Sequence, residues 1–221
     1  LRVVLGRAPA DAGLLNDGLE TVVFSKDDLD RFALSSHQKA IEAAKSGAFE
    51  AEIVGVEIET AEGEECHTVD EGIRFDASLE GIQGVKLLAE GGVITAASSS
   101  QICDGASGVM IVNEEGLKKL NVKPLAKIVH LSVMGHDPVI MLEAPIPATK
   151  RALDKAGLSV DDIDLFEVNE AFGSVPVAYC KELGVDGDKI NVHGGAIALG
   201  HPLGGSGTKL MATLVSALKR K

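Results

Sequence analysis

The sequence contains no tryptophan, one tyrosine and three cysteines, and its acidic residues outnumber its basic ones by 33 to 21. Aromatic platforms for single-stranded nucleic acid are therefore scarce, and the net charge of −12 opposes binding to nucleic acid or to an anionic membrane. The cysteines Cys66, Cys103 and Cys180 lie far apart and form no Cys-x-x-Cys pair, which argues against a disulfide framework and a zinc site. No apolar run reaches the roughly 20 residues that a membrane span needs.

What remains is an ordinary globular composition. The 221 residues are 45% hydrophobic and 24% charged, which is enough to bury a sizeable core in one large or two small domains. Residues 1–5 are too short for the apolar region of a signal peptide, since Arg7 and Pro9 follow at once. We therefore expect a cytoplasmic protein.

Helices and strands are predicted to alternate along most of the chain. Ser25 is a favoured N-cap, and Asp27 and Asp28 suit the first turn of a helix over 25–47. Further helices are predicted over 114–120, 147–156, 170–183 and 206–219, and strands over 53–58, 108–113, 126–133, 163–168 and 190–192. This β-α-β-α rhythm indicates an α/β fold with a layered sheet. The last helix is apolar around nearly its whole circumference, which predicts burial between two layers.

One stretch holds most of the net charge. Residues 50–80 contain eleven acidic side chains and a single base, Arg74. A solvated surface is the simpler interpretation. A calcium loop is the alternative, but the spaced Asp/Asn pattern with its glycine is absent.

The densest motif is a glycine-rich segment between a predicted strand and the last helix. Six glycines fall within 194–207, so the backbone can approach a ligand or another segment closely. The segment is neither a Walker A loop, a Gly-x-Gly-x-x-Gly motif nor a nucleophile elbow. His201 lies inside it, before Pro202, and could act as a base or hydrogen-bond donor. A turn histidine bonded to backbone carbonyls is the alternative.

A second motif, Val168-Asn-Glu-Ala-Phe172, lies at a predicted strand end, where open α/β sheets present residues to ligands. Asn169 is either an active-site amide or an ordinary helix N-cap. Glu170 has no assignable role, and a structural acid is the default reading.

Taken together, these two motifs resemble those of the thiolases, the acyl-CoA C-acyltransferases. The resemblance rests on Asn-Glu-Ala-Phe followed by Gly-Gly-Ala-Ile-Ala-Leu-Gly-His-Pro-Leu-Gly, and it extends through residues 25–40, 95–106 and 137–147. It implies a layered αβαβα sandwich, here with most of the loop domain over 1–102 and the C-terminal core half, incomplete at its end, over 103–221. The all-apolar last helix fits such a sandwich.

The resemblance also implies roles for single residues. His201 corresponds to the histidine that deprotonates the nucleophilic thiol and donates to the thioester oxygen, and Asn169 to the residue that holds a water in the same oxyanion hole. Four further residues correspond to the lining of the pantetheine channel: Ser100, Met141, Ala171 and Phe172. Coenzyme A would be substrate or product, and no cofactor is expected.

The family pattern breaks at the cysteines. The resemblance implies a nucleophilic cysteine in an N-terminal half and an acid/base cysteine beyond the histidine, and neither has a counterpart here. Cys103 has the features of a buried, inert thiol. We therefore expect Claisen condensation or thiolysis of 3-ketoacyl-CoA, with this chain inactive alone, in a homo-oligomer or with a partner chain that supplies the missing half. The alternatives are a non-catalytic thiolase-like subunit and a CoA-binding module, the latter using bases such as Lys26, Arg31 or Lys39 for the CoA phosphates.

Overall fold

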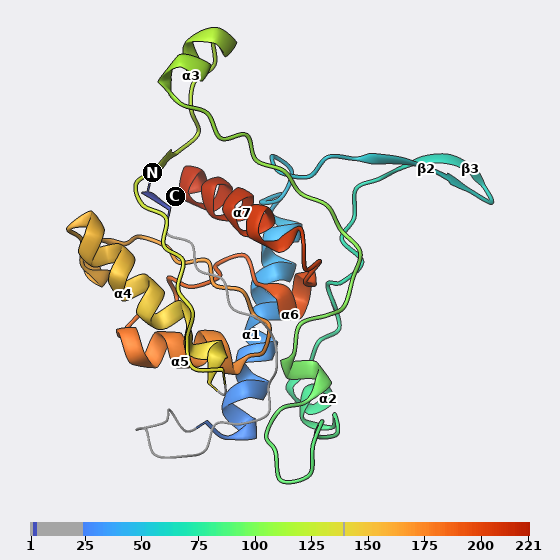
Figure 1. Ribbon diagram of the computed structural model, residues 1–221. Helices are drawn as coiled ribbons and strands as arrows, with labels where there is room; N and C mark the ends of the chain where they lie inside the picture. The colour runs from blue at the N-terminus through green and yellow to red at the C-terminus, as the bar shows by residue number, and fades with distance from the viewer. Residues whose placement is uncertain (1, 4–23, 139) are drawn as a thin grey trace.

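The computed structural model describes residues 2–3, 24–138 and 140–221. Four short strands, seven α-helices and three 3-10 helices occur in these ranges: β1 (Arg2–Val3), α1 (Lys26–Lys45), β2 (Val56–Thr60), β3 (Gly63–His67), α2 (Leu79–Gln83), η1 (Ala96–Ser98), α3 (Glu114–Leu120), β4 (Lys127–Ile128), η2 (Met141–Glu143), α4 (Pro145–Ala156), η3 (Val160–Asp162), α5 (Ser174–Leu183), α6 (Ala196–Leu199) and α7 (Ser206–Arg220). Figure 1 shows α1 running through the middle of the body, with α4 and α5 on one side of it and α2 on the other.

Helix α1 begins and ends where its sequence predicts. The Ser25 hydroxyl accepts a hydrogen bond from the Asp28 backbone, and the Asp28 carboxylate accepts one from the Ser25 backbone, which closes a capping box. The helix ends before Gly47, whose positive φ of 68° a glycine adopts without strain. Its inner face is fully buried, with Leu29, Ala33 and Ala40 completely inaccessible.

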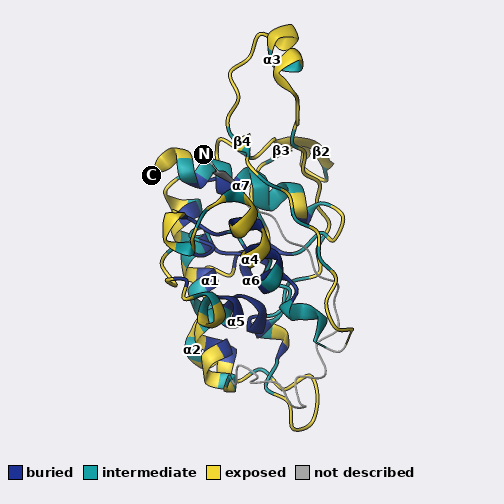
Figure 2. Cartoon of the chain, turned by 60° about the vertical axis from the view of Figure 1, so that its left-hand side comes forward, coloured by how far each residue is buried: buried dark blue, intermediate teal, exposed yellow. Residues whose placement is uncertain are grey.

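Two hydrophobic clusters form most of the core, which Figure 2 shows in dark blue. The larger one joins α4 and α5 to residues 163–168 and to Ile190. The second joins the C-terminal half of α1 to α6 through small side chains such as Ala40 and Ala198. Lys39 ties the two regions, because its ammonium donates to the carbonyl oxygens of Gly187 and Ile190, each at 2.9 Å.

The predicted strands are largely wrong as regular elements. Residues 163–168 and 190–192 meet only as a parallel bridge between Phe166 and Ile190, and 126–133 pairs only through β4 with β1. Residues 108–113 belong to no strand and have no strand partner in the described chain, and Met110 and Ile111 are exposed. A strand exists only where a neighbour accepts its backbone hydrogen bonds, and these ranges provide few neighbours.

Two predictions about helices also need correction. Helix α5 starts at Ser174 rather than at Glu170, because Phe172 pairs with Ser99 in an antiparallel bridge that keeps the preceding residues extended. Helix α7 buries one face, with Thr213, Leu214 and Ala217, whereas its other apolar side chains are half-buried. Burial on all sides, expected from the sequence, is therefore only partly achieved within the described residues.

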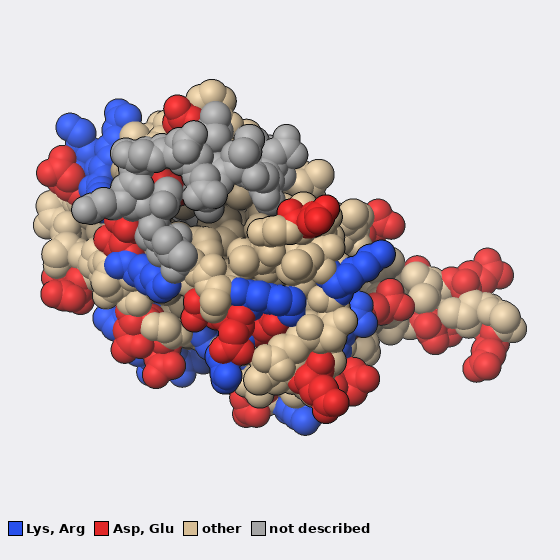
Figure 3. All heavy atoms as spheres, turned by 90° about the horizontal axis from the view of Figure 1, so that it is seen from below, with Lys and Arg blue, Asp and Glu red and all other residues tan. Residues whose placement is uncertain are grey.

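Residues 56–67 of the acidic stretch form a projecting arm. Strands β2 and β3 pair antiparallel from Val56–His67 to Thr60–Gly63 and extend away from the body (Figure 1). Figure 3 shows acidic side chains along this arm, and its glutamates are mostly exposed, as a solvated surface requires. In the described part of the chain, no three His, Cys, Asp or Glu side chains are arranged to hold a metal ion, and no helix has the length and apolarity to cross a membrane.

Candidate active site

The segment 98–101 brings the two predicted motifs together. On one side the Ser100 amide donates to the Ala171 carbonyl at 3.0 Å, and the Gly173 amide donates to the Ser98 carbonyl at 2.8 Å. On the other side the His201 amide donates to the Gln101 carbonyl at 3.0 Å. One extended segment thus lies between the Asn-Glu-Ala-Phe motif and the glycine-rich segment and holds both by backbone hydrogen bonds.

The Gln101 side chain strengthens this arrangement. Its amide nitrogen is within hydrogen-bond distance of the carbonyl oxygens of Ile197 and Gly72, each at 2.8 Å, and of Ala198 at 3.1 Å. It therefore joins α6 to the loop before α2. Gln101 lies within the segment 95–106 that carries the resemblance, but its role is not predictable from that segment, because its side-chain contacts are made to backbone atoms far away in the chain.

Asn169 and His201 meet at this junction. The Asn169 amide nitrogen lies 3.4 Å from His201 Nε2, across 32 residues of sequence. Helix α5 is capped at Gly173, so the alternative of Asn169 as its N-cap is wrong. The His201 ring nitrogens contact the side chains of Asn169 and Ser206, rather than the backbone carbonyls that a simple turn histidine would use.

The contacts of Ser206 favour one tautomer of His201. Ser206 Oγ lies 2.6 Å from His201 Nδ1 and 3.1 Å from the Pro202 carbonyl oxygen. A carbonyl only accepts, so both contacts are satisfied when the hydroxyl donates to Pro202 and accepts from Nδ1–H. Nε2 then carries the lone pair, which accepts from the Asn169 amide. Burial, and after it the positive charge of Lys209, lowers the pKa of His201, which keeps the imidazole neutral and ready to accept a proton.

Glu170 is the centre of a buried hydrogen-bond network. Its carboxylate is completely inaccessible and accepts hydrogen bonds from the Ser36 hydroxyl at 2.7 Å, the Asn191 amide at 2.9 Å and the Ile197 backbone at 3.1 Å. Burial raises the pKa of Glu170, and the three donors oppose that rise. The sequence identified only a structural acid here. A charged side chain within a mostly apolar segment must find hydrogen-bond partners if it is buried. The acidic residue at position 170 is therefore the feature of the sequence that could have indicated this network.

The glycines of the motif serve close packing. A Cβ at Gly194 would lie 2.5 Å from the Ser36 carbonyl oxygen, and one at Gly195 would lie 2.2 Å from the Glu170 carboxyl carbon. A Cβ at Gly200 would lie 2.3 Å from Cys103 Sγ. Gly204 and Gly207 have open space around them. The first three glycines therefore let the loop pack against α1, Glu170 and residue 103.

The four residues expected to line a channel are half-buried. Ser100, Ala171 and Phe172 belong to the hydrogen-bonded junction beside Asn169. Met141 comes from η2, a separate element that packs against α5. Among the cysteines, Cys103 lies beside Gly200, next to His201, Cys66 is exposed on β3, and burial raises the pKa of the Cys180 thiol.

The bases suggested for CoA phosphates are engaged elsewhere. Lys26 pairs with Asp30 at 2.6 Å, and Arg31 pairs with Asp27 at 2.7 Å. Lys39 holds the carbonyls of Gly187 and Ile190. All three cations thus have structural partners within or beside α1, which weakens that expectation.

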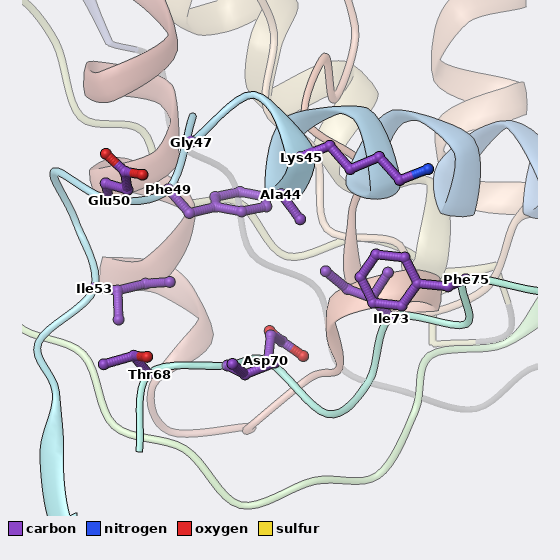
Figure 4. A pocket seen from close by; sticks show the side chains of 11 residues that line it. Ala44, Lys45, Gly47, Phe49, Glu50, Ile53, Thr68, Asp70, Ile73 and Phe75 are labelled. Carbon is purple, nitrogen blue, oxygen red and sulfur yellow. The ribbon is translucent and has the colours of Figure 1, made fainter. Parts of the chain in front are cut away.

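A separate pocket of about 530 Å³ lies at the end of α1 (Figure 4). Its lining comes from the last turn of α1, the segment that follows and residues 68–75, including Phe49, Ile73 and Phe75. None of the predicted site residues lines it. Lys45, Glu50, Thr68 and Asp70 also contribute to its lining.

Two family models match this chain, one over each half. The thiolase N-terminal domain model matches residues 11–115, and the thiolase C-terminal domain model matches residues 122–221. The sequence-based division at 102/103, between loop domain and core half, is a different one and stays a prediction.

Individual relatives agree with these matches. The chain is 48% identical over 196 residues to the steroid 3-ketoacyl-CoA thiolase of Mycobacterium tuberculosis, covering 89% of this chain and 47% of that protein. It is 44% identical over 198 residues to the mouse mitochondrial 3-ketoacyl-CoA thiolase, covering 89% of this chain and 50% of that protein. The chain thus spans about half the length of the curated relatives it matches.

Solved structures show the same fold. The crystal structure of human mitochondrial 3-ketoacyl-CoA thiolase superposes with a TM-score of 0.82 at 43% identity, covering 89% of this chain and 50% of that one. The Bacillus anthracis acetyl-CoA acetyltransferase superposes with a TM-score of 0.81 at 37% identity, with the same coverage. The mixed α/β fold is therefore the thiolase fold, and the chain belongs to the thiolase family.

Proposed function

We propose that this chain carries the base and part of the oxyanion site of an acyl-CoA C-acyltransferase of the thiolase type. The reaction would be Claisen condensation or thiolysis of a 3-ketoacyl-CoA. The observation that carries this proposal is the 3.4 Å pairing of the Asn169 amide with Nε2 of His201. Its support is that relatives at 43–48% identity are named 3-ketoacyl-CoA thiolases.

The geometry suits both halves of acyl transfer. His201 Nε2, which carries the lone pair of the neutral ring, would take the proton of a cysteine thiol, and the thiolate sulfur would attack the acyl carbonyl carbon. The electron pair displaced onto the carbonyl oxygen needs donors in place, and the protonated His201 and a water held by Asn169 would supply them. Collapse of the tetrahedral intermediate would form the acyl-cysteine by breaking one bond of the substrate. In thiolysis this is the carbon–carbon bond, and acetyl-CoA leaves as a carbanion that takes a proton from the acid/base cysteine; in condensation it is the thioester bond, and CoA leaves as the thiol with the proton held by His201. The acyl group would then pass to CoA, whose thiol gives its proton to the acid/base cysteine, or to acetyl-CoA after that cysteine removes its α-proton, and the nucleophilic cysteine would leave as the thiolate.

The nucleophile would come from outside this chain. Cys66 lies on the exposed arm, the Cys180 thiol has a raised pKa, and Cys103 packs against Gly200. We therefore assign the role of nucleophile to none of the three. In this proposal the chain alone turns over no substrate, and a second chain segment supplies both catalytic cysteines.

Substrate binding follows from the same family assignment. Ser100, Met141, Ala171 and Phe172 would contact the pantetheine arm, and CoA would be substrate or product, without a resident cofactor or metal. A crystal structure of human mitochondrial 3-ketoacyl-CoA thiolase in complex with CoA superposes with a TM-score of 0.80, which supports CoA as the ligand class. We place the protein in the cytoplasm, although some of its relatives are named as mitochondrial.

The decisive experiment is complementation. The purified chain is mixed with the N-terminal half of the Mycobacterium tuberculosis relative and with a peptide carrying that protein's segment beyond the matched region, and acetoacetyl-CoA and longer 3-ketoacyl-CoA esters are assayed for thiolysis. Activity should require all components and disappear with His201→Ala, while Gly204→Ala, in open space nearby, retains it. Thiolysis by the chain alone that persists in His201→Ala would refute the proposal.

A non-catalytic role with a partner is the second candidate, and one observation favours it. A run of large apolar side chains is exposed over residues 102–133: Ile102, Met110, Ile111, Val122, Leu125, Leu131 and Val133. Unpaired, apolar extended segments of this kind pair readily with another chain. Light scattering that shows a stable oligomer, together with calorimetry that detects no CoA binding, would favour a purely structural subunit. CoA binding without complementation would favour a CoA-binding module.

A further inference from the structure

We propose that Glu170 is a positioning residue, which acts through Asn169 to hold the Asn169 amide against His201. The inference rests on the proposed function, because it assigns a task to a residue of that same site. The evidence for it is the set of hydrogen bonds that hold Val168 and Glu170, the residues on either side of Asn169, to the segment that leads to His201.

The residue before Asn169 is held by Asn191. The Asn191 side-chain oxygen accepts from the Val168 amide at 2.8 Å, and its amide donates to the Val168 carbonyl at 2.9 Å. This side chain therefore pairs with Val168 as a neighbouring strand would. Asn191 itself adopts a φ of 45°, an uncommon conformation for a residue other than glycine, which the surrounding contacts must maintain.

The residue after Asn169 is held by three elements at once. The Glu170 carboxylate accepts from Ser36 on α1, from Asn191 and from the Ile197 backbone in α6. Ser36 in turn accepts from the Gly195 amide at 3.1 Å. Ile197 lies in α6, four residues before His201, so the Glu170 carboxylate links the residue that follows Asn169 to the segment leading to the imidazole.

All three groups that face the carboxylate are donors. Oε1 accepts from Asn191, and Oε2 accepts from both Ser36 and Ile197. The NH₂ group of a glutamine would therefore face the Asn191 donor in one orientation and the other two donors in the opposite one, and would leave them without an acceptor. The Glu170→Gln side chain has nearly the same size and shape. It therefore tests the hydrogen bonds and the charge without opening a cavity.

The pKa of His201, followed by NMR titration of the isotope-labelled chain, separates positioning from a direct charge effect. Loss of the negative charge of Glu170 alone would lower the pKa of His201, since a nearby carboxylate favours the imidazolium. Loss of the Asn169 amide raises it, because that donor stabilises the neutral ring. We expect Glu170→Gln to raise the pKa of His201, by most of the rise produced by Asn169→Ala, and to add little in the Asn169→Ala background.

Two further variants keep this test decisive. Ser36→Ala removes one donor, retains the charge and should raise the pKa of His201 in the same direction by a smaller amount. Thr149→Val removes a buried hydrogen bond to Tyr179, in the other cluster, and should lower the melting temperature without moving His201. A lowered pKa in Glu170→Gln, or an equal change with and without Asn169, would overturn the positioning role. The NMR titration needs no turnover. A failed complementation experiment would therefore count only against the proposed function and not against the positioning role of Glu170.

Discussion

The Ser206 hydroxyl lies 2.6 Å from His201 Nδ1 and also contacts the Pro202 carbonyl oxygen at 3.1 Å, so one side chain selects the tautomer of the candidate base. Ser206 occupies the first position of α7 and is buried, which prevents water from replacing it easily. The start of the last helix thus determines which ring nitrogen is free at the site.

Ser206→Ala should shift the neutral His201 ring toward the Nε2–H tautomer. The variant removes the acceptor for Nδ1–H, whereas the Asn169 amide can turn so that its oxygen accepts from Nε2–H. Nitrogen chemical shifts from long-range ¹H–¹⁵N correlation spectra distinguish the two tautomers directly. A ring that stays in the Nδ1–H form in the variant would show that Ser206 does not govern the tautomer.

Gly195→Ala should destabilise the fold by about 2–3 kcal/mol, since its methyl group would overlap a carboxylate that three hydrogen bonds hold in place. Gly204→Ala, in the same loop with nothing within 4 Å of its Cβ, should change the stability by less than about 0.5 kcal/mol. Urea denaturation of the two variants makes the comparison. Equal losses would mean that the loop tolerates a side chain at Gly195 by moving Glu170.

Local signals in the sequence predict the helices well. Ser25 and Asp28 mark the start of α1, and the acidic first turn and basic last turn mark α3. A helix makes its backbone hydrogen bonds within itself, so the residues next to its ends determine where it begins and stops. The strand predictions failed at 108–113 because pairing depends on a distant neighbour that periodicity does not reveal.

The candidate site divides in the same way. Glycine density and a position at a predicted strand end single out its two motifs, the family resemblance supplies their roles, and the structure places Asn169 beside His201. The junction through Gln101 and the network around Glu170 were not foreseen, because Ser36 and Glu170 are 134 residues apart in sequence. Such contacts are set by packing, which places buried polar groups where partners already exist.

His37 should make the fold sensitive to acid. Its side chain is 4% exposed, its Nδ1 has no hydrogen-bond partner among the described residues, and burial, followed by the charge of Arg74, lowers its pKa. The unfolded chain then binds a proton below about pH 6.5 that the folded chain resists, so stability falls as the pH drops through that range.

His37→Gln tests this linkage. The variant keeps a polar side chain of similar length and removes the titration, so the loss of stability between pH 7 and pH 5 should be smaller than in the unmodified chain. Urea midpoints at several pH values give the two slopes. His193 and His201 also have pKa values lowered by burial, so a residual slope of the same sign should remain. Identical slopes would show that His37 titrates alike in both states.

Tyr179, the chain's single tyrosine, should resist ionisation. It is 3% exposed, and burial raises its pKa to about 12, opposed by the hydroxyl of Thr149 at 2.9 Å. The folded state keeps the phenol protonated where the unfolded chain begins to lose that proton, so stability falls as the pH rises from about 10 toward 12. With no tryptophan present, absorbance at 295 nm reports on this residue alone.

The phenolate signal should appear only near pH 12, or together with alkaline unfolding. Thr149→Val should raise the midpoint of the Tyr179 titration further, because it removes a hydrogen-bond partner of the phenolate. Ionisation near pH 10 in a chain that is still folded would place Tyr179 in contact with solvent and contradict its position in the core.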